Sequence, residues 1–400
     1  MPWKKTVYAS WFAQILSITG FSIVLPFLPY YVRELGVVGD AEVARWAGYV
    51  CSSAAVTLAL FAPVWGMLAD RYGRKPMVMR SMFGGAIVLV LMGFSRSVGE
   101  LIVYRLIQGG LTGTVTASIA LVACAAPRER SAYALGMMQA AVFIGMSVGP
   151  LIGGVVADHF GYRAAFMVAA SLLAAGGLLV QFAVKENFTF DDTAGKAERG
   201  NYGEVFAAVG FMAAISALCA LRFANSIGHP VFPLLVEQIR GSSEGINTTT
   251  GGIMAAGGLA AALSAGVLGR FSDALGHKRI LIWFSLYTAV VALLYTQAQS
   301  VAHLFVLRLF FGLGAAGVTP AANAIIRNIT HDRNIGKAYG VTSSLGAIGW
   351  MLGPFAGGYV AASFNLRTPF YLMSAALVVA AVLVACSVKA DPPRAQPSDS

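Results

Sequence analysis

Three arginines are the residues of this chain most able to do chemistry, because each lies inside a long apolar run. They are Arg105, Arg222 and Arg308. An arginine at the centre of a membrane span costs roughly 2.5–3.5 kcal/mol, so such a residue normally faces a water-filled cavity or a partner. For Arg222 we expect contact with a ligand, with snorkelling or carbonyl bonding as the alternative. For Arg105 and Arg308, proton coupling and the bonding of carbonyls freed beside Pro150 and Pro354 are both open.

The carboxylates that could carry a proton lie at the ends of the apolar runs or between them, since no Asp or Glu falls in the middle of one. A buried carboxylate or imidazole can titrate near neutral pH, because desolvation disfavours its charged form. The candidates are Glu34, Asp158, His159 and His229. An interior that holds cations and no anions also favours anionic or neutral ligands over lipophilic cations.

Other reactive residue types form no recognisable site. The four cysteines, Cys51, Cys124, Cys219 and Cys386, lie in apolar segments without metal-ligand spacing, and we interpret them as packing residues. No grouping of His, Asp, Glu, Ser and Cys predicts a catalytic or metal centre. We therefore expect neither enzymatic activity nor a bound metal or cofactor.

The composition identifies lipid as the solvent of the whole chain. Of 400 residues, 57% are hydrophobic and 12% are charged, with a mean hydropathy of +0.71, whereas soluble domains have about 25% charged residues. An apolar run of about 20 residues predicts a membrane-spanning helix. Twelve such runs lie at about 6–32, 46–69, 76–95, 99–124, 132–157, 164–184, 205–236, 248–268, 279–299, 302–326, 338–362 and 368–388. The prediction is an all-α membrane protein.

The distribution of the net charge of +10 indicates a membrane protein rather than a protein that binds nucleic acid. With the N-terminus in the cytoplasm, 19 of the 28 lysines and arginines fall on the cytoplasmic side, six on the outer side and three inside spans. Positive charge collects on the cytoplasmic side of a membrane protein, so this asymmetry predicts that both termini are cytoplasmic. We expect a multi-pass protein of the inner (plasma) membrane with no nucleic-acid partner.

The second half of the chain repeats the first. Pro26 and Pro29 recur 204 residues later as Pro230 and Pro233. Three further segments recur at nearly the same spacing: 66–75 as 269–278, 101–109 as 304–312, and 136–154 as 340–358. Each half has six spans, an even number, so both enter the membrane from the same side and form a parallel repeat. We predict a six-helix bundle at 1–184, a cytoplasmic linker at 185–204, a second bundle at 205–388 and a cytoplasmic tail at 389–400.

Glycine and proline mark the segment 136–154 and its repeat. Glycine inside a soluble helix costs about 0.5–1 kcal/mol against alanine, whereas between membrane helices it lets two backbones approach closely. The first copy contains Gly136, Gly145, Gly149, Pro150, Gly153 and Gly154, and the second includes Gly353 and Pro354. We expect both helices to lie at the interface between the bundles, and the prolines to bend them.

Over essentially the whole chain, these segments resemble motifs of the major facilitator superfamily. The loop Gly66-Met-Leu-Ala-Asp70-Arg71-Tyr-Gly73-Arg74-Lys75 is similar to motif A, and Arg105-Leu-Ile-Gln108-Gly109 is similar to motif B. Segment 136–154 is similar to motif C of the drug/proton antiporters, in particular the twelve-helix drug efflux family and its MdtG-type bacterial branch. The resemblance implies twelve helices in two pseudo-symmetric six-helix bundles, alternating access, and export of small molecules in exchange for protons.

The resemblance to motif A also implies a conformational latch. Asp70 would cap a neighbouring helix N-terminus, or pair with an arginine, in only one conformation, an effect of up to about 2 kcal/mol when partly buried. A short hairpin with exposed cations explains the same residues without any latch. The second copy keeps Asp273, Gly276 and Lys278 but lacks a counterpart of Arg71, so we expect a weaker second latch.

A substrate cavity is expected near mid-membrane, where Arg222 has no charged counterpart in the first half. Polar and aromatic residues on the first, fifth, seventh and eleventh spans are candidates to line it: Gln14, Phe27, Tyr30, Gln139, Phe143, Asn225 and Trp350. For each of them, simple packing or contact with lipid is the alternative. We predict a monomeric, proton-coupled exporter of small amphipathic molecules. A metabolite importer or facilitator, and a membrane ligand sensor without net transport, are the alternatives.

Overall fold

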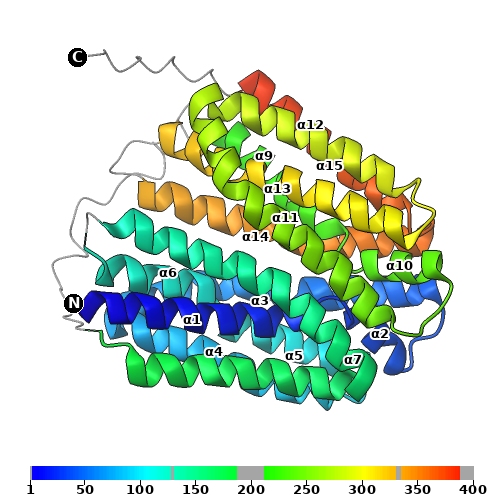
Figure 1. Ribbon diagram of the computed structural model, residues 1–400, viewed down its shortest axis with the longest axis horizontal. Coiled ribbons are helices and arrows are strands. Elements are labelled where there is room, and N and C mark those ends of the chain that lie inside the picture. The colour runs from blue at the N-terminus through cyan, green and yellow to red at the C-terminus, as the bar shows by residue number, and fades with distance from the viewer. Residues whose placement is uncertain (1, 128–129, 187–210, 330–334, 388–400) are drawn as a thin grey trace.

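The computed structural model describes residues 2–127, 130–186, 211–329 and 335–387, and the elements in these ranges are all helices (Figure 1). By length and hydropathy, seven of the described helices could each cross a membrane, and the bent pair α1–α2 would make an eighth span. One of the seven, Tyr133–Ala183, has 51 residues and is long enough to cross twice. The predicted all-α membrane fold is confirmed. The predicted linker beyond residue 186 and the predicted tail lie outside the described residues.

The first half of the chain forms one bundle of helices. It contains α1 (Pro2–Ile23), α2 (Leu28–Glu34), α3 (Asp40–Tyr72), α4 (Arg74–Gly93), α5 (Val98–Leu111), α6 (Thr114–Ala125) and α7 (Ser131–Ala183). The helix pairs α1–α2 and α5–α6 each make one span. The long helix α7 makes two spans, because it reverses direction at a non-helical residue in its middle.

The second half repeats this arrangement. It contains α9 (Phe211–Ile227), α10 (Phe232–Arg240), α11 (Ile246–Leu275), α12 (His277–Tyr295), α13 (Val301–Ile329), α14 (Ile335–Ser363) and α15 (Thr368–Ser387). Here α9 and α10 correspond to α1 and α2, and α14 and α15 correspond to the two spans of α7. In the part of the chain that the structure describes, the two halves thus have the same order of helices.

Glycine and proline set the breaks inside spans. The pair α1–α2 bends by 46° across residues 24–27, which include Pro26. Gly113 separates α5 from α6 with a φ of +123°, and Gly161 has a φ of +81° at the reversal of α7. Residues with a Cβ rarely adopt these positive angles. Pro150, where we expected a bend, lies inside α7 without interrupting it, and the one non-helical residue of that helix is Gly161.

The halves meet mainly through α7 with α11 and α3 with α14, and α2 also contacts α10. Figure 1 shows the first half, coloured blue to green, beside the second half, coloured light green to red, with α2 next to α10 at one end of the molecule. Helix α1 begins at the opposite end.

Candidate functional site

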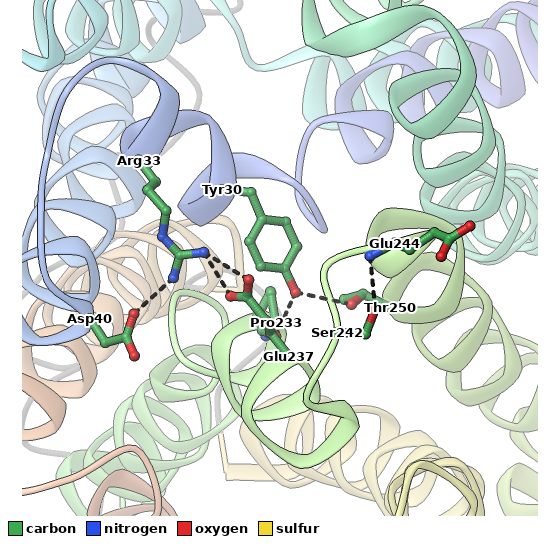
Figure 2. A network of polar contacts seen from close by, with 8 residues as sticks. All are labelled: Tyr30, Arg33, Asp40, Pro233, Glu237, Ser242, Glu244 and Thr250. Carbon is green, nitrogen blue, oxygen red and sulfur yellow. Dashed lines mark hydrogen bonds and ion pairs between the residues drawn. The ribbon is translucent and has the colours of Figure 1, made fainter.

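At the α2–α10 end, polar side chains connect the two halves (Figure 2). Arg33 of α2 donates from Nη1 to both carboxylate oxygens of Glu237 in α10, at 2.8 and 3.0 Å. Tyr30 donates from its hydroxyl to the carbonyl oxygen of Pro233 at 2.6 Å, and its hydroxyl lies 3.2 Å from Oγ1 of Thr250. Tyr30 and Arg33 both lie on α2, beyond the α1–α2 bend, so the bend directs their side chains toward α10 of the other half.

Asp158, near the reversal of α7, caps the first turn of α11 in the other half. Its Oδ1 accepts from the side-chain amide of Asn247 at 2.7 Å and from the Asn247 backbone N–H at 3.2 Å. Its Oδ2 accepts from the backbone N–H of Thr248 at 2.7 Å. A carboxylate is favoured here because the first N–H groups of a helix lack intrahelical partners and carry partial positive charge. We call Tyr30, Arg33, Asp158, Glu237 and Asn247 the gate residues.

Glycines allow the backbones of the two halves to touch behind the gate residues. A Cβ on Gly154 of α7 would overlap the carbonyl oxygen of Asn247 in α11. On the second contact, a Cβ on Gly48 of α3 would lie 2.7 Å from the carbonyl oxygen of Pro354 in α14, and one on Gly358 would lie 2.9 Å from Cα of Gly48. We call these contacts the α7–α11 and α3–α14 seams. Both seams lie in the part of the molecule nearer α2 and α10.

Most of the glycines expected at the interface instead pack inside their own half. Gly145, Gly149 and Gly153 face α1, where the Ser22 hydroxyl donates to the Gly145 carbonyl oxygen at 2.8 Å. In the second half the equivalent bond joins the Ser226 hydroxyl to the carbonyl oxygen of Gly349 at 3.3 Å. Gly353 likewise faces α9, whereas Gly136 has open space beside it. The expectation of an inter-bundle glycine face therefore holds for Gly154 alone among the first-copy glycines.

The arginines Arg105 and Arg308 have different surroundings, and among the described residues neither donates to a carbonyl beside Pro150 or Pro354, which was one of the two roles left open. Arg105 donates from Nε to the carbonyl oxygen of Val50 at 3.1 Å and from Nη1 to the side chain of Gln108 at 2.8 Å. Gly109 allows this close crossing, because its Cβ position is filled by the backbone of α3. The guanidinium of Arg308 instead lies over the ring of Phe232, at 5.1 Å from its centre.

Arg308 belongs to a small pocket inside the second half. Asn225, His229, Phe232 and Tyr295 are among the residues that line it with Arg308, and its free volume is about 10 Å³, room for roughly one water molecule. The set contains a fixed cation, hydrogen-bonding groups and aromatic walls. It can therefore hold a polar or anionic group beside an apolar one.

Comparison with known proteins decides the family. The family model described as Major Facilitator Superfamily matches residues 10–243 and 214–400, which together span nearly the whole chain. The chain belongs to the major facilitator superfamily. The resemblance seen in the sequence motifs is confirmed, and the protein is a membrane transporter of this superfamily.

Among curated relatives are multidrug efflux proteins of bacteria. The multi-drug resistance efflux pump PmrA of Streptococcus pneumoniae is 33% identical over 377 residues, covering 93% of each chain. The multidrug resistance protein MdtG of Salmonella paratyphi A is 32% identical over 384 residues, covering 95% of this chain and 94% of MdtG.

Solved structures share the fold of this chain. A bacterial homologue of the human lysosomal transporter Spinster, crystallised in an inward-facing and occupied conformation, has a TM-score of 0.80 at 15% identity and covers 96% of each chain. The human organic anion transporter MFSD10 (TETRAN) has a TM-score of 0.72 at 19% identity, covering 96% of this chain and all of MFSD10.

The structure brings two of the predicted cavity residues, Asn225 and Trp350, to the region of the Arg308 pocket. Asn225 lines the pocket of Arg308, and the ring of Trp350 lies 5.3 Å from that of His229, which also lines it. Arg222 is exposed on α9 beside Gly346 of α14. Asn225 also donates to the Leu221 carbonyl oxygen within its helix.

The other predicted cavity residues have different surroundings. Phe27 is fully buried against the rings of Tyr162 and Phe166 and is a core residue. Gln14 is also fully buried, and both polar atoms of its side chain lack a hydrogen-bond partner among the described residues. Gln139 is exposed on α7, and Phe143 is half-buried on the same helix.

The four proton candidates separate into two places. Glu34 lines an open groove of about 310 Å³ at the α2–α10 end, together with the gate residues Tyr30, Arg33 and Glu237. Asp158 lies in the gate itself, and His159 beside it is exposed. His229 alone lies deep in the transporter, close enough to Arg308 for its charge to act on the imidazole.

At the predicted latch loop, Glu186 caps the start of the following helix, α4. Glu186 accepts from the backbone N–H groups of Arg74 and Lys75, at 2.9 and 2.7 Å, and so caps α4. The side chains of Asp70 and Asp273 lie outside the described residues. Lys75 donates to the carbonyl oxygens of Gln181 and Val184, at 2.8 and 2.7 Å.

The remaining residues of the two latch loops lie at turns or on the surface. Lys278 repeats the contact of Lys75 by donating to the Ala385 carbonyl oxygen at 2.8 Å. The turns before these lysines use Gly73 and Gly276, with φ of +94° and +93°. Arg71 lies over the Tyr72 ring at 5.5 Å, and Gly66 has open space around it.

Sequence reasoning missed Glu186, Arg33 and Glu237 as functional residues. A signal for the last two was present, because they occupy equivalent positions 204 residues apart and carry opposite charges. Opposite charges at symmetry-related positions can meet at the axis that relates the two halves. Glu186 follows the last residue of α7 by only a few positions, and periodicity alone does not indicate which helix it reaches.

Proposed function

We propose that this transporter exports small amphipathic molecules from the cytoplasm in exchange for protons, by alternating access between two bundles. The observation that carries the proposal is the form of the contact between the halves. A polar gate and two glycine seams join them near the α2–α10 end. Such a contact can separate as two rigid bodies tilt, since it is made of backbone surfaces and a few side chains. The efflux relatives PmrA and MdtG support export as the direction.

In this proposal the α2–α10 end faces outward and both termini are cytoplasmic. The excess of lysine and arginine in the loops on the termini side supports this orientation. The protein would work in the inner (plasma) membrane as a monomer, without a cofactor, and the proton gradient would supply the energy. The bundles would comprise residues 1–184 and 205–388.

Asp158 is our leading candidate for the proton-coupling group. It is a carboxylate at the contact between the halves, and its bonds to Asn247 and Thr248 require it to accept hydrogen bonds. Protonation would remove the charge that the α11 N-terminus stabilises and so favour separation of the halves. Burial raises the pKa of Asp158, but the hydrogen bonds from Thr248 and Asn247 together outweigh it and lower the pKa below its ordinary value, so proton uptake from the outer side would accompany opening to that side. His229 is the second candidate.

Transport in inverted membrane vesicles tests the proposal. Vesicles containing the protein are loaded with acidic buffer, and uptake of a neutral amphipathic fluorescent dye is followed. We expect uptake that exceeds that of vesicles without the protein and that stops when a protonophore collapses the gradient. Flux unaffected by the gradient would indicate a facilitator, and movement of dye together with protons would indicate an importer. Binding of dye without flux would indicate a sensor.

A further inference from the structure

The internal repeat provides a comparison between two equivalent arginines. Arg105 in α5 and Arg308 in α13 occupy the same position of the repeated segment. The first donates to two neutral acceptors, from Nε to the Val50 carbonyl oxygen and from Nη1 to the Gln108 side chain. Gln108 is itself buried, so this pairing is internal to the first half. Arg105 therefore has acceptors for Nε and Nη1 within its own half.

The second arginine lacks those acceptors. Phe311 occupies the position equivalent to Gln108, and the guanidinium of Arg308 lies 5.5 Å from the centre of its ring. The Nε of Arg308 is buried and has no hydrogen-bond partner in the part of the chain that the structure describes. Among the described residues no carboxylate forms an ion pair with Arg308. A buried arginine donor without an acceptor is costly, so an acceptor supplied from outside the chain would be bound favourably.

Other groups around Arg308 fit the same kind of ligand. The Tyr295 hydroxyl is buried close to the guanidinium of Arg308, and its proton has no acceptor among the described residues. Gly257 of α11 leaves room for the arginine, because a Cβ there would lie 2.8 Å from Cγ and 3.0 Å from Nε of Arg308. His229 and Asn225 also line the pocket, and its described lining contains hydrogen-bond donors and no carboxylate.

We propose that Arg308 and Tyr295 bind the anionic head group, a carboxylate or sulfonate, of an amphipathic substrate. The free volume of about 10 Å³ holds roughly one water molecule, so the head group enters this pocket in place of water. The rings of Phe232 and Phe311 beside the guanidinium provide an apolar surface for the rest of the molecule. This inference rests on the proposed function and names the substrate class of its site, with Arg308 rather than Arg222 as the main anion contact.

Binding of a matched pair of probes tests this site. Purified protein in detergent is titrated calorimetrically with 2-naphthoate and with the neutral 2-naphthamide, which has the same ring system. A charge-assisted hydrogen bond corresponds to about a 10- to 100-fold change in affinity. We expect wild type to prefer naphthoate by at least about tenfold, and Arg308→Gln to lose that preference while binding naphthamide nearly as well. The control is Arg96→Gln, which removes an exposed arginine and should leave both affinities unchanged.

Further variants and salts keep the test decisive. If Arg308→Gln does not yield folded protein, Arg308→Lys and Tyr295→Phe should each weaken naphthoate more than naphthamide. Chloride replacing gluconate should change naphthoate affinity less than twofold, whereas a tenfold loss would assign the pocket to an inorganic anion and overturn the proposal. Equal affinities of wild type for both probes would also overturn it. Because these titrations do not depend on a proton gradient, they can succeed or fail independently of the vesicle experiment.

Discussion

Asp158 shows how one carboxylate can hold two bundles together. Its two oxygens accept from two backbone N–H groups and one side-chain amide of the other half. The ion pair of Arg33 with Glu237 acts in the same place, but 37% of the arginine side chain is exposed. An exposed pair contributes about 0.2–1 kcal/mol, less than a carboxylate capping a helix in a partly buried site. Asp158 is therefore the stronger of the two contacts.

We expect Asp158→Asn to shift the protein toward opening at the α2–α10 end. The amide keeps the shape of the side chain but loses the charge, which removes about 1–2 kcal/mol of closure. Spin labels are placed at Val38 and Ser242, which are exposed and lie on opposite halves, after the native cysteines are replaced. Pulsed electron–electron double resonance then measures the distance between the two labels across this end. The distribution should gain a longer component. The neighbouring exposed His159→Gln should leave it unchanged, and an unchanged distribution in Asp158→Asn would contradict the role of the carboxylate.

Sequence alone predicts individual residues only in part. Asp158 could be chosen because few carboxylates lie at the ends of the apolar runs, and Arg308 because charge inside one is costly. For Phe27 the alternative of packing holds, since an aromatic side chain near a proline frame is as suited to a core as to a cavity. The difference between the two arginines depends on partners from other helices, which spacing along one helix does not reveal.

At the scale of elements, the glycines of α7 serve two different contacts. A Cβ on Gly149 would lie 2.6 Å from the Thr19 carbonyl oxygen of α1 in the same half, whereas one on Gly154 would overlap the Asn247 carbonyl oxygen of α11 in the other half. A side chain at Gly149 therefore disturbs a bundle. A side chain at Gly154 disturbs the contact between bundles.

We expect Gly149→Leu and Gly154→Ala to abolish dye transport for different reasons. Gly149→Leu should also lower the thermal unfolding temperature of the protein in detergent, because α1 and α7 can no longer pack. Gly154→Ala should keep that temperature close to wild type while lengthening the distance between Val38 and Ser242 labels. Gly136→Ala is the matched control, since its Cβ meets open space. Full transport by the Gly154 variant would exclude a role for the α7–α11 seam.

The cap on α4 gives a second prediction at this scale. Glu186 accepts from two N–H groups at the start of the helix, and loss of such a cap typically costs about 0.5–2 kcal/mol. Glu186→Gln should therefore lower the thermal unfolding temperature of the first half. The exposed Glu244→Gln serves as the control, and equal stability of the two variants would show that the cap contributes little.

For the whole molecule, sequence reasoning recovers more than it does for single residues. Length, hydropathy and the repeated segments predict an all-α fold of two related halves, because each span must satisfy its own backbone in lipid. The repeat does not predict which surfaces of the halves meet. The α7–α11 and α3–α14 seams are one such pairing, made visible only when Gly154, Gly48 and Pro354 are seen against helices from the opposite half.

The different surroundings of Arg105 and Arg308 have a consequence for the history of the protein. If the halves descend from one ancestral gene copied in tandem, both arginines began with the same neighbours. The first half has Gln108 where the second half has Phe311. This difference left the first arginine in a structural role and freed the second to acquire new chemistry. Selection for a new cargo can act on the later half without altering the earlier one, which lets such proteins diversify while their movement is conserved.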